Sequence, residues 1–155
     1  MTTRGQKWIP SKTYHEIFSM VPRSGVDVIV IDKGKVLLSK RDIPPGKGKW
    51  HIPGGGVAKG ERIMQTAHRK IKDETGLKIK VKRLVGVWDD PVRNPAWHDI
   101  TFVLLAQSVG GKLRGSKEGK EVRFFNPKKL PKMMFDHNRE IQYALKGRFY
   151  MRGLK

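Results

Sequence analysis

The chain contains no cysteine. This absence excludes disulfide bridges, thiolate zinc sites and cysteine nucleophiles. It fits a reducing compartment, and the N-terminal MTTRGQKWIP has no apolar core of the kind that a signal peptide needs. We therefore expect a cytoplasmic protein.

Long hydrophobic runs are also missing. The longest apolar stretches, such as VIVI and FVLLA, have the length of a buried β-strand and are far too short to cross a bilayer. Internal repeats and low-complexity tracts are absent from the sequence as well. We expect no membrane-embedded segment and no repeat architecture.

Acidic residues are scarce relative to basic ones. The chain has 14 Asp and Glu against 33 Lys and Arg, a formal net charge of +19. Such an excess predicts attraction to polyanions, which include nucleotides, nucleic acid and acidic membrane surfaces. It is equally typical of a solvated lysine-rich surface, because no single basic patch is visible in the sequence.

What is present indicates one mixed α/β domain. A chain of 155 residues with 37% hydrophobic residues is enough for one packed core. We predict a single domain over 1–155, with an N-terminal extension at 1–25 and a basic tail at 146–155. Its expected elements are a hairpin around Lys33-Gly34, a helix at 62–75, a helix near 138–145 and strands at 77–88, 100–109 and 121–125. Strands mixed with two or three helices predict an α/β sandwich.

The helix predicted at 62–75 has an unusual charged flank. Ile63, Met64, Ala67 and Ile71 share its core face, and beside them lie, in sequence order, Arg69, Lys70, Asp73 and Glu74. A glycine-rich turn, PGGG, precedes the helix, and Gly76 is placed to end it. Carboxylates on a rigid element beside exposed backbone groups suit Mg²⁺. On spacing alone, a solvated charged face explains the same residues.

The complete spacing resembles the Nudix box, Gly-x5-Glu-x7-Arg-Glu-U-x-Glu-Glu-x-Gly-U, where U is aliphatic. The residues that keep the pattern are Gly55, Glu61, Arg69, Ile71, Glu74, Gly76 and Leu77. The resemblance implies an α/β/α sandwich with a mixed sheet. It also implies a pyrophosphohydrolase, dependent on Mg²⁺ or Mn²⁺, that cleaves a nucleoside diphosphate linked to another group.

The resemblance assigns roles within the box. Glu74 and Asp73 would ligate the metal together with the Gly54 carbonyl. Arg69 would hold the carboxylates in place, and Glu61 would support the loop and helix or join the metal shell. The metal would polarise the phosphate and activate the attacking water.

Two residues depart from the box. Asp73 is shorter than the family's Glu, and Lys70 replaces an acid. The Lys70 ammonium lies one turn from Glu74 and would compete with a cation for the same oxygens. We expect retained activity with weaker metal affinity. The alternative is a non-catalytic Nudix protein that binds a nucleotide or RNA.

Segments outside the box resemble the ADP-ribose pyrophosphatase-like branch. These are DDPVRNPAWHDITFVLLA and EVRFFNPKKLPKMMFDH. The resemblance implies a dinucleotide-like substrate such as ADP-ribose. The residues outside the box that we expect to take part are Arg41, Trp50 and Arg93 in substrate binding, Glu121 in metal binding and His137 as a base.

Each of these residues also has a possible structural role that involves neither substrate nor metal. Arg93 would form a loop salt bridge to Asp89 or Asp90, and Glu121 would be a solvated strand end. His137 would cap the last helix, and Trp50 would be a core residue.

The N-terminal YHEIFSMVPRSGVDVIVID is instead similar to the GDP-mannose mannosyl hydrolase branch, which carries an extra helix before its first strand. That enzyme is the second candidate. RNA binding through the basic surface and a homodimer remain open partner predictions.

Overall fold

The computed structural model describes residues 9–154, and part of the predicted N-terminal extension, residues 1–8, lies outside the described residues, as does residue 155. Within 9–154 no helix combines the length and apolar character that crossing a membrane requires. The elements in chain order are α1 (Ser11–Met20), β1 (Arg23–Asp32), β2 (Lys35–Lys40), β3 (Trp50–His51), β4 (Gly54–Gly56), α2 (Ile63–Thr75), β5 (Leu77–Trp88), β6 (Asp99–Gly111), β7 (Val122–Phe125), α3 (His137–Leu145) and β8 (Tyr150–Met151).

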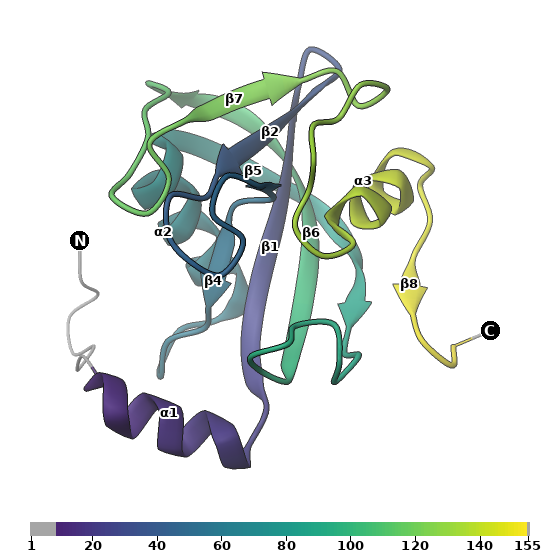
Figure 1. Ribbon diagram of the computed structural model, residues 1–155. Coiled ribbons are helices and arrows are strands. Elements are labelled where there is room, and N and C mark those ends of the chain that lie inside the picture. The colour runs from purple at the N-terminus through teal and green to yellow at the C-terminus, as the bar shows by residue number, and fades with distance from the viewer. Residues whose placement is uncertain (1–8, 155) are drawn as a thin grey trace.

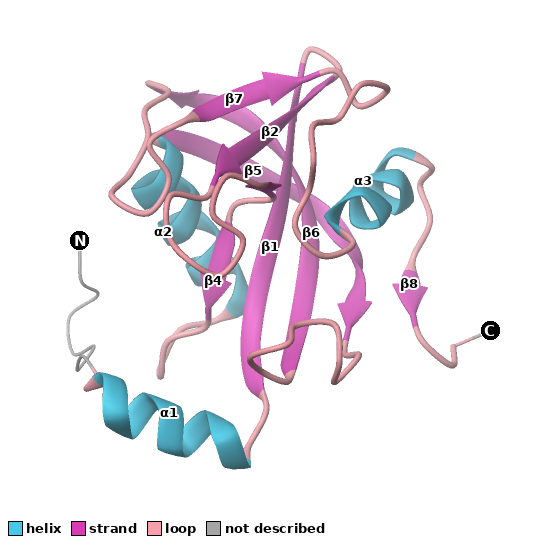
Figure 2. Ribbon diagram, in the orientation of Figure 1, coloured by secondary structure: helices cyan, strands magenta, loops and turns pink. Residues whose placement is uncertain are grey.

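The strands form one mixed sheet (Figure 2). Its main order is β3-β2-β1-β6-β5-β8, with β4 added to β1 and β7 added to β2. The central strands β1 and β6 run parallel, whereas β5 is antiparallel to β6 and β2 is antiparallel to β1. The crossover between the two parallel strands contains α2, which is how the candidate metal helix is brought against the centre of the sheet.

Helices α2 and α3 lie on opposite sides of the sheet (Figure 1). Alternate residues of β1 explain this arrangement, because successive side chains of a strand point to opposite faces. Val26, Val28 and Val30 pack with Ala67 and Ile71 of α2 in one core cluster. On the other face, the second cluster joins Ile29 of β1 to Ile141 and Ala144 of α3. The predicted α/β/α sandwich with a mixed sheet is confirmed.

The predicted hairpin turn is confirmed at Lys33 and Gly34, which have φ values of 49° and 74°. Three short strands were not predicted. Strands β3 and β4 lie inside the segment expected to be mostly loop, and β8 lies inside the predicted basic tail. Each is two or three residues long and exists because a neighbouring strand supplies its hydrogen bonds, which sequence periodicity does not reveal.

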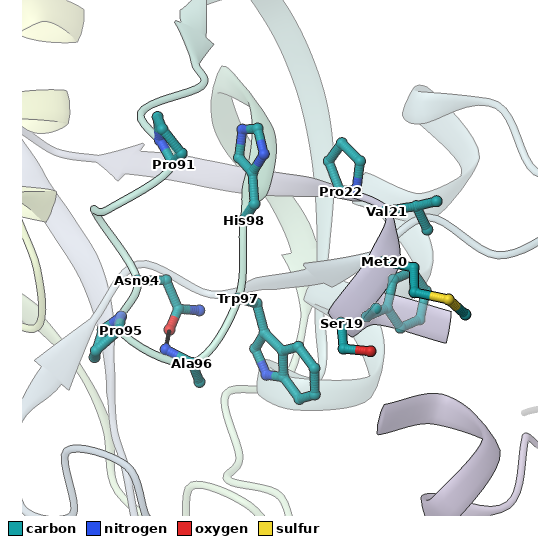
Figure 3. A pocket seen from close by; sticks show the side chains of 11 residues that line it. Ser19, Met20, Val21, Pro22, Pro91, Asn94, Pro95, Ala96, Trp97 and His98 are labelled. Carbon is teal, nitrogen blue, oxygen red and sulfur yellow. Dashed lines mark hydrogen bonds between the residues drawn. The ribbon is translucent and has the colours of Figure 1, made fainter. Parts of the chain in front are cut away.

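Helix α1 has no buried residue and attaches to the sheet through an aromatic cluster. The Tyr14 and Phe18 rings lie 5.7 and 6.5 Å from Trp97, and Arg23 pairs with Asp99 at 2.7 Å. A cavity of about 350 Å³ lies between the end of α1 and the loop that carries Trp97 (Figure 3). A helix before the first strand is thus present, as in the second candidate branch.

Candidate active site

The glycine-rich turn lies against both β1 and α2. Gly54 pairs with Asp27 and Gly55 with Val26 in an antiparallel bridge. A Cβ on Gly54 would overlap the Val26 carbonyl oxygen, and a Cβ on Gly55 would overlap Cε of Lys70. Gly54 must be glycine because the backbone of β1 leaves no space for a side chain, whereas at Gly55 the flexible end of Lys70 fills the space.

Glu61 and Arg69 form a clasp between the loop and α2. The Glu61 carboxylate accepts hydrogen bonds from Arg69 Nε at 2.6 Å and Nη2 at 2.8 Å, from Thr66 Oγ1 at 2.8 Å and from the Ala58 amide at 3.2 Å. These bonds, that of Arg69 above all, lower the pKa of Glu61 to about 2. Arg69 therefore holds Glu61, and the clasp fixes the direction in which α2 leaves the turn.

Lys70 and Glu74 form an ion pair within α2. Lys70 Nζ lies 2.8 Å from Glu74 Oε1, with side chains 21% and 11% exposed. The expectation that the Lys70 ammonium pairs with Glu74 is confirmed. The carboxylate that the box offers to a metal is therefore held by an ammonium in this structure.

Asp73 lies on a different side of the helix. It lines a cavity of about 680 Å³ together with a basic loop that contributes Arg114, Lys117 and Lys120. Arg114 also donates to the Asp73 carbonyl oxygen at 3.3 Å, near the end of α2. Gly76 then ends the helix in the left-handed conformation, with φ of 75°, as predicted.

The family of this chain is identified by its similarity to known proteins. Residues 21–145 match the NUDIX domain family. This chain is a member of the Nudix family.

Several of the proteins that it resembles are named as hydrolases. Over 121 residues it is 42% identical to the ADP-ribose pyrophosphatase of Methanocaldococcus jannaschii, covering 78% of this chain and 72% of that protein. A MutT Nudix hydrolase from Burkholderia pseudomallei superposes with a TM-score of 0.71 at 26% identity, covering 80% of this chain and 98% of the other.

A further structural neighbour is a bifunctional NMN adenylyltransferase/ADP ribose pyrophosphatase from Francisella tularensis, complexed with AMP and a manganese ion. It gives a TM-score of 0.75 at 22% identity, over 88% of this chain and 47% of that one, and this similarity shows the fold. Nudix hydrolases generally use divalent metals, and this chain is a Nudix hydrolase.

A second cluster of ionisable groups lies on the other face of the sheet, close to the glycine-rich turn. Oxygens of Asp27 and Glu140 and a ring nitrogen of His137 lie within 4.8 Å of one another. Glu140 is fully buried, and its Oε2 has no hydrogen-bond partner among the described residues. The cluster was not predicted. Its signals in the sequence were an acid inside the apolar strand VDVIVI and an acid on the apolar face of the last helix.

Burial makes one proton of this cluster hard to remove. It raises the pKa of Asp27 to about 7, against the favourable charge of Arg93, and the charge of Glu74 raises it further. Burial and the neighbouring Asp27 also raise the pKa of Glu140. Both shifts favour a protonated carboxyl group in this pair, because two adjacent buried carboxylates are costly to ionise together.

His137 is held in one tautomer. Its Nδ1 accepts a hydrogen bond from the Ile52 amide at 2.9 Å, so in the neutral ring Nε2 carries the hydrogen and faces Asp27 at 3.8 Å. Burial keeps the ring neutral by lowering its pKa. The one lone pair of the ring is therefore used by Ile52, which argues against His137 as a metal ligand or as a base. Burial also lowers the pKa of His51.

Arg93 joins this cluster. Its guanidinium pairs with Asp136 and Glu140, and only 12% of its side chain is exposed. The alternative partners considered from the sequence were Asp89 and Asp90, and Asp90 instead pairs with Arg152 at 3.4 Å. Arg93 thus ties the loop after β5 to α3.

The other predicted residues lie around β2 and β3. Trp50 is 8% exposed and packs edge-on against Phe125 at 4.7 Å, which is the core position considered as its alternative role. Glu121 pairs with Lys40 at 3.1 Å and with Arg123 at 2.8 Å. In the next loop, the Arg41 Nη2 donates weakly to the Pro44 carbonyl oxygen at 3.4 Å, and its Nε is buried without a partner among residues 9–154.

Proposed function

We propose that this Nudix hydrolase cleaves the diphosphate of a nucleoside diphosphate joined to a sugar, with ADP-ribose as the leading substrate. The observation that carries the proposal is Glu74, held by Lys70 in the last turn of α2, a helix that the Glu61–Arg69 clasp fixes to the preceding loop. The relative named ADP-ribose pyrophosphatase, at 42% identity, supports the choice of substrate.

A divalent cation fits this donor set, and we propose Mg²⁺ or Mn²⁺. The Lys70 ammonium at 2.8 Å from Glu74 Oε1 supports this choice, because that carboxylate already pairs with a cation, which a metal ion would displace. Glu74 and the Gly54 carbonyl would hold the ion, which polarises a phosphate and activates a water molecule when bound. Asp73, the further ligand expected from the sequence, lines the cavity with Arg114, Lys117 and Lys120 and would have to turn toward Glu74 to join them. Glu121 is the more distant candidate, since it would first have to release Lys40 and Arg123.

The chain's own groups have separable roles in this scheme. The Glu61–Arg69 clasp positions α2 against the turn, and Lys70 sets the charge next to Glu74. Arg93 acts from beneath the site by holding α3. Arg41 would contact a substrate group through its guanidinium, whose Nη2 donates weakly to the Pro44 carbonyl oxygen at 3.4 Å. Trp50 supports this loop from the core.

The second candidate function is nucleotide or RNA binding without cleavage. The Lys70–Glu74 ion pair favours it, because the pair opposes metal binding at Glu74. A steep loss of RNA affinity with salt is the expected mark of contacts driven by the +19 charge. The GDP-mannose mannosyl hydrolase-like reaction has the α1 helix in its favour.

The test is phosphate release, coupled to phosphatase, from ADP-ribose, GDP-mannose, other nucleotide sugars and 5′-triphosphate RNA, with Mg²⁺ or Mn²⁺. We expect metal-dependent cleavage of ADP-ribose that Glu74→Gln abolishes. Binding of the panel with no cleavage would refute the hydrolase and establish the binding protein. Cleavage of GDP-mannose in preference to ADP-ribose would establish the second branch.

A further inference from the structure

The Lys70 side chain folds back onto the active site although lysine ordinarily extends into water. Its Nζ contacts Glu74 Oε1 at 2.8 Å, and its Cε lies so close to Gly55 that any side chain there would collide with it. A Cβ at Gly55 would also lie 3.0 Å from Nζ. The ammonium is thus placed between the helix carboxylate and the glycine-rich turn.

The neighbouring charges explain why the ammonium stays there. Arg69 is committed to Glu61, whose lowered pKa of about 2 shows that this acid is ionised and satisfied at neutral pH. Glu74 is only 11% exposed and needs a counter-charge of its own, because an ionised carboxylate is costly to bury unpaired. Lys70 supplies that charge from one helical turn away.

A diphosphate that approaches Glu74 meets a like charge. At about 4 Å, two unit charges repel by roughly 1 kcal/mol in water and by roughly 4 kcal/mol near a protein surface. Lys70 is the cation that contacts this carboxylate, and an ammonium has three N–H donors, one of which Glu74 takes in this arrangement. The same group can therefore neutralise Glu74 and donate to a phosphate oxygen.

We propose that Lys70 is a resident cation of the active site, which takes the place of one divalent ion and hydrogen-bonds the diphosphate of the substrate. This inference rests on the proposed nucleoside diphosphate substrate. It makes Lys70 a substrate-binding residue, and it predicts diphosphate binding that does not require a metal.

The test is titration calorimetry with ADP in the presence of excess EDTA. The compared proteins are the wild type, Lys70→Met, Lys70→Arg and Lys72→Met. Lys72 is an exposed lysine of the same helix, so its substitution removes the same charge without touching Glu74. We expect wild type and Lys72→Met to bind ADP equally, Lys70→Met to bind at least tenfold more weakly, and Lys70→Arg to recover most of the affinity.

Two results would overturn the inference. One is wild-type protein that does not bind ADP without metal, and the other is Lys70→Met that binds as tightly as wild type. A Gly55→Ala variant gives an independent check, because its methyl group must displace Lys70 while leaving the charge in the protein. It should weaken ADP binding as Lys70→Met does, with thermal melts confirming that each variant is folded.

These outcomes are separable from those of the proposed hydrolysis. Metal-free ADP binding that depends on Lys70, without cleavage of any substrate in Mg²⁺, would support the resident cation and refute the hydrolase. Cleavage in Mg²⁺ with no contribution of Lys70 to ADP binding would support the hydrolase and refute the resident cation.

Discussion

Replacing Glu61 with Gln should loosen the clasp that positions α2. Glutamine keeps the size of the side chain but removes the charge that Arg69 Nε and Nη2 contact at 2.6 and 2.8 Å. It also supplies an NH₂ group where the carboxylate oxygens accept hydrogen bonds. Arg69, with 17% of its side chain exposed, would lose its charged partner.

The pKa of Glu61 sets the size of the effect. Its fall from 4.5 to about 2 corresponds to at most about 3.5 kcal/mol of stability, at about 1.4 kcal/mol per pKa unit. Because solvent reaches the edge of the pair, we expect roughly 2 kcal/mol at pH 7. In a chain of this length that loss lowers the Tm by roughly 4–8 °C.

The pH dependence identifies the mechanism. A carboxyl group with a lowered pKa in the folded state stabilises the protein above its unfolded pKa, and the contribution disappears as the pH falls through the folded value. The difference between wild type and Glu61→Gln should therefore shrink between pH 4.5 and pH 2. Urea denaturation at pH 7 and near pH 3 measures it, with Glu16→Gln on the exposed side of α1 as the control. A variant as stable as wild type at pH 7, or a loss that does not change with pH, would refute the reasoning.

Three further perturbations test the rest of the site. Glu74→Gln should abolish hydrolysis with little change in Tm; undiminished turnover would remove the metal from the mechanism. Lys70→Glu should tighten Mn²⁺ binding at least tenfold, because a positive charge about 5 Å from a divalent ion costs roughly 1.5 kcal/mol even in water; titration of Mn²⁺ by electron paramagnetic resonance measures it, and an unchanged affinity would show that Lys70 is a bystander. Asp27→Asn should remove a pH-dependent loss of stability: the pKa of Asp27 is raised to about 7, so its contribution is complete below about pH 4 and is lost as the pH rises through 7. Wild type should therefore lose a few kcal/mol more than the variant between pH 5 and 8 in urea denaturation, and parallel curves would contradict the raised pKa of Asp27.

The second ionic cluster connects α3 to the strand that pairs with the glycine-rich turn. Asp27 belongs to β1 and pairs with Gly54 of β4, while Glu140 and His137 belong to α3. Arg93 adds the loop after β5 through its contacts with Asp136 and Glu140. Three segments far apart in the sequence are therefore connected beneath the site by buried charge.

Much of the site could be predicted from local sequence. The helix, its glycine turn and its end at Gly76 follow from periodicity and from residues with special backbone freedom. The Lys70–Glu74 pair follows from the spacing of four residues on a helix, which brings two side chains together whatever the remainder of the fold does. These features depend on contacts within a few residues, so the sequence alone determined them.

Only the tertiary structure decided what the distant residues do. Arg93 forms ion pairs with Asp136 and Glu140, which are more than 40 residues away in the sequence, and not with the nearby Asp89 and Asp90. The strand VDVIVI places an acid among apolar residues, but it does not show that Asp27 meets Glu140 and His137 of the last helix. Burial, pKa and tautomer depend on which segments pack together, and that is a property of the assembled sheet and its two helical layers, not of any local pattern.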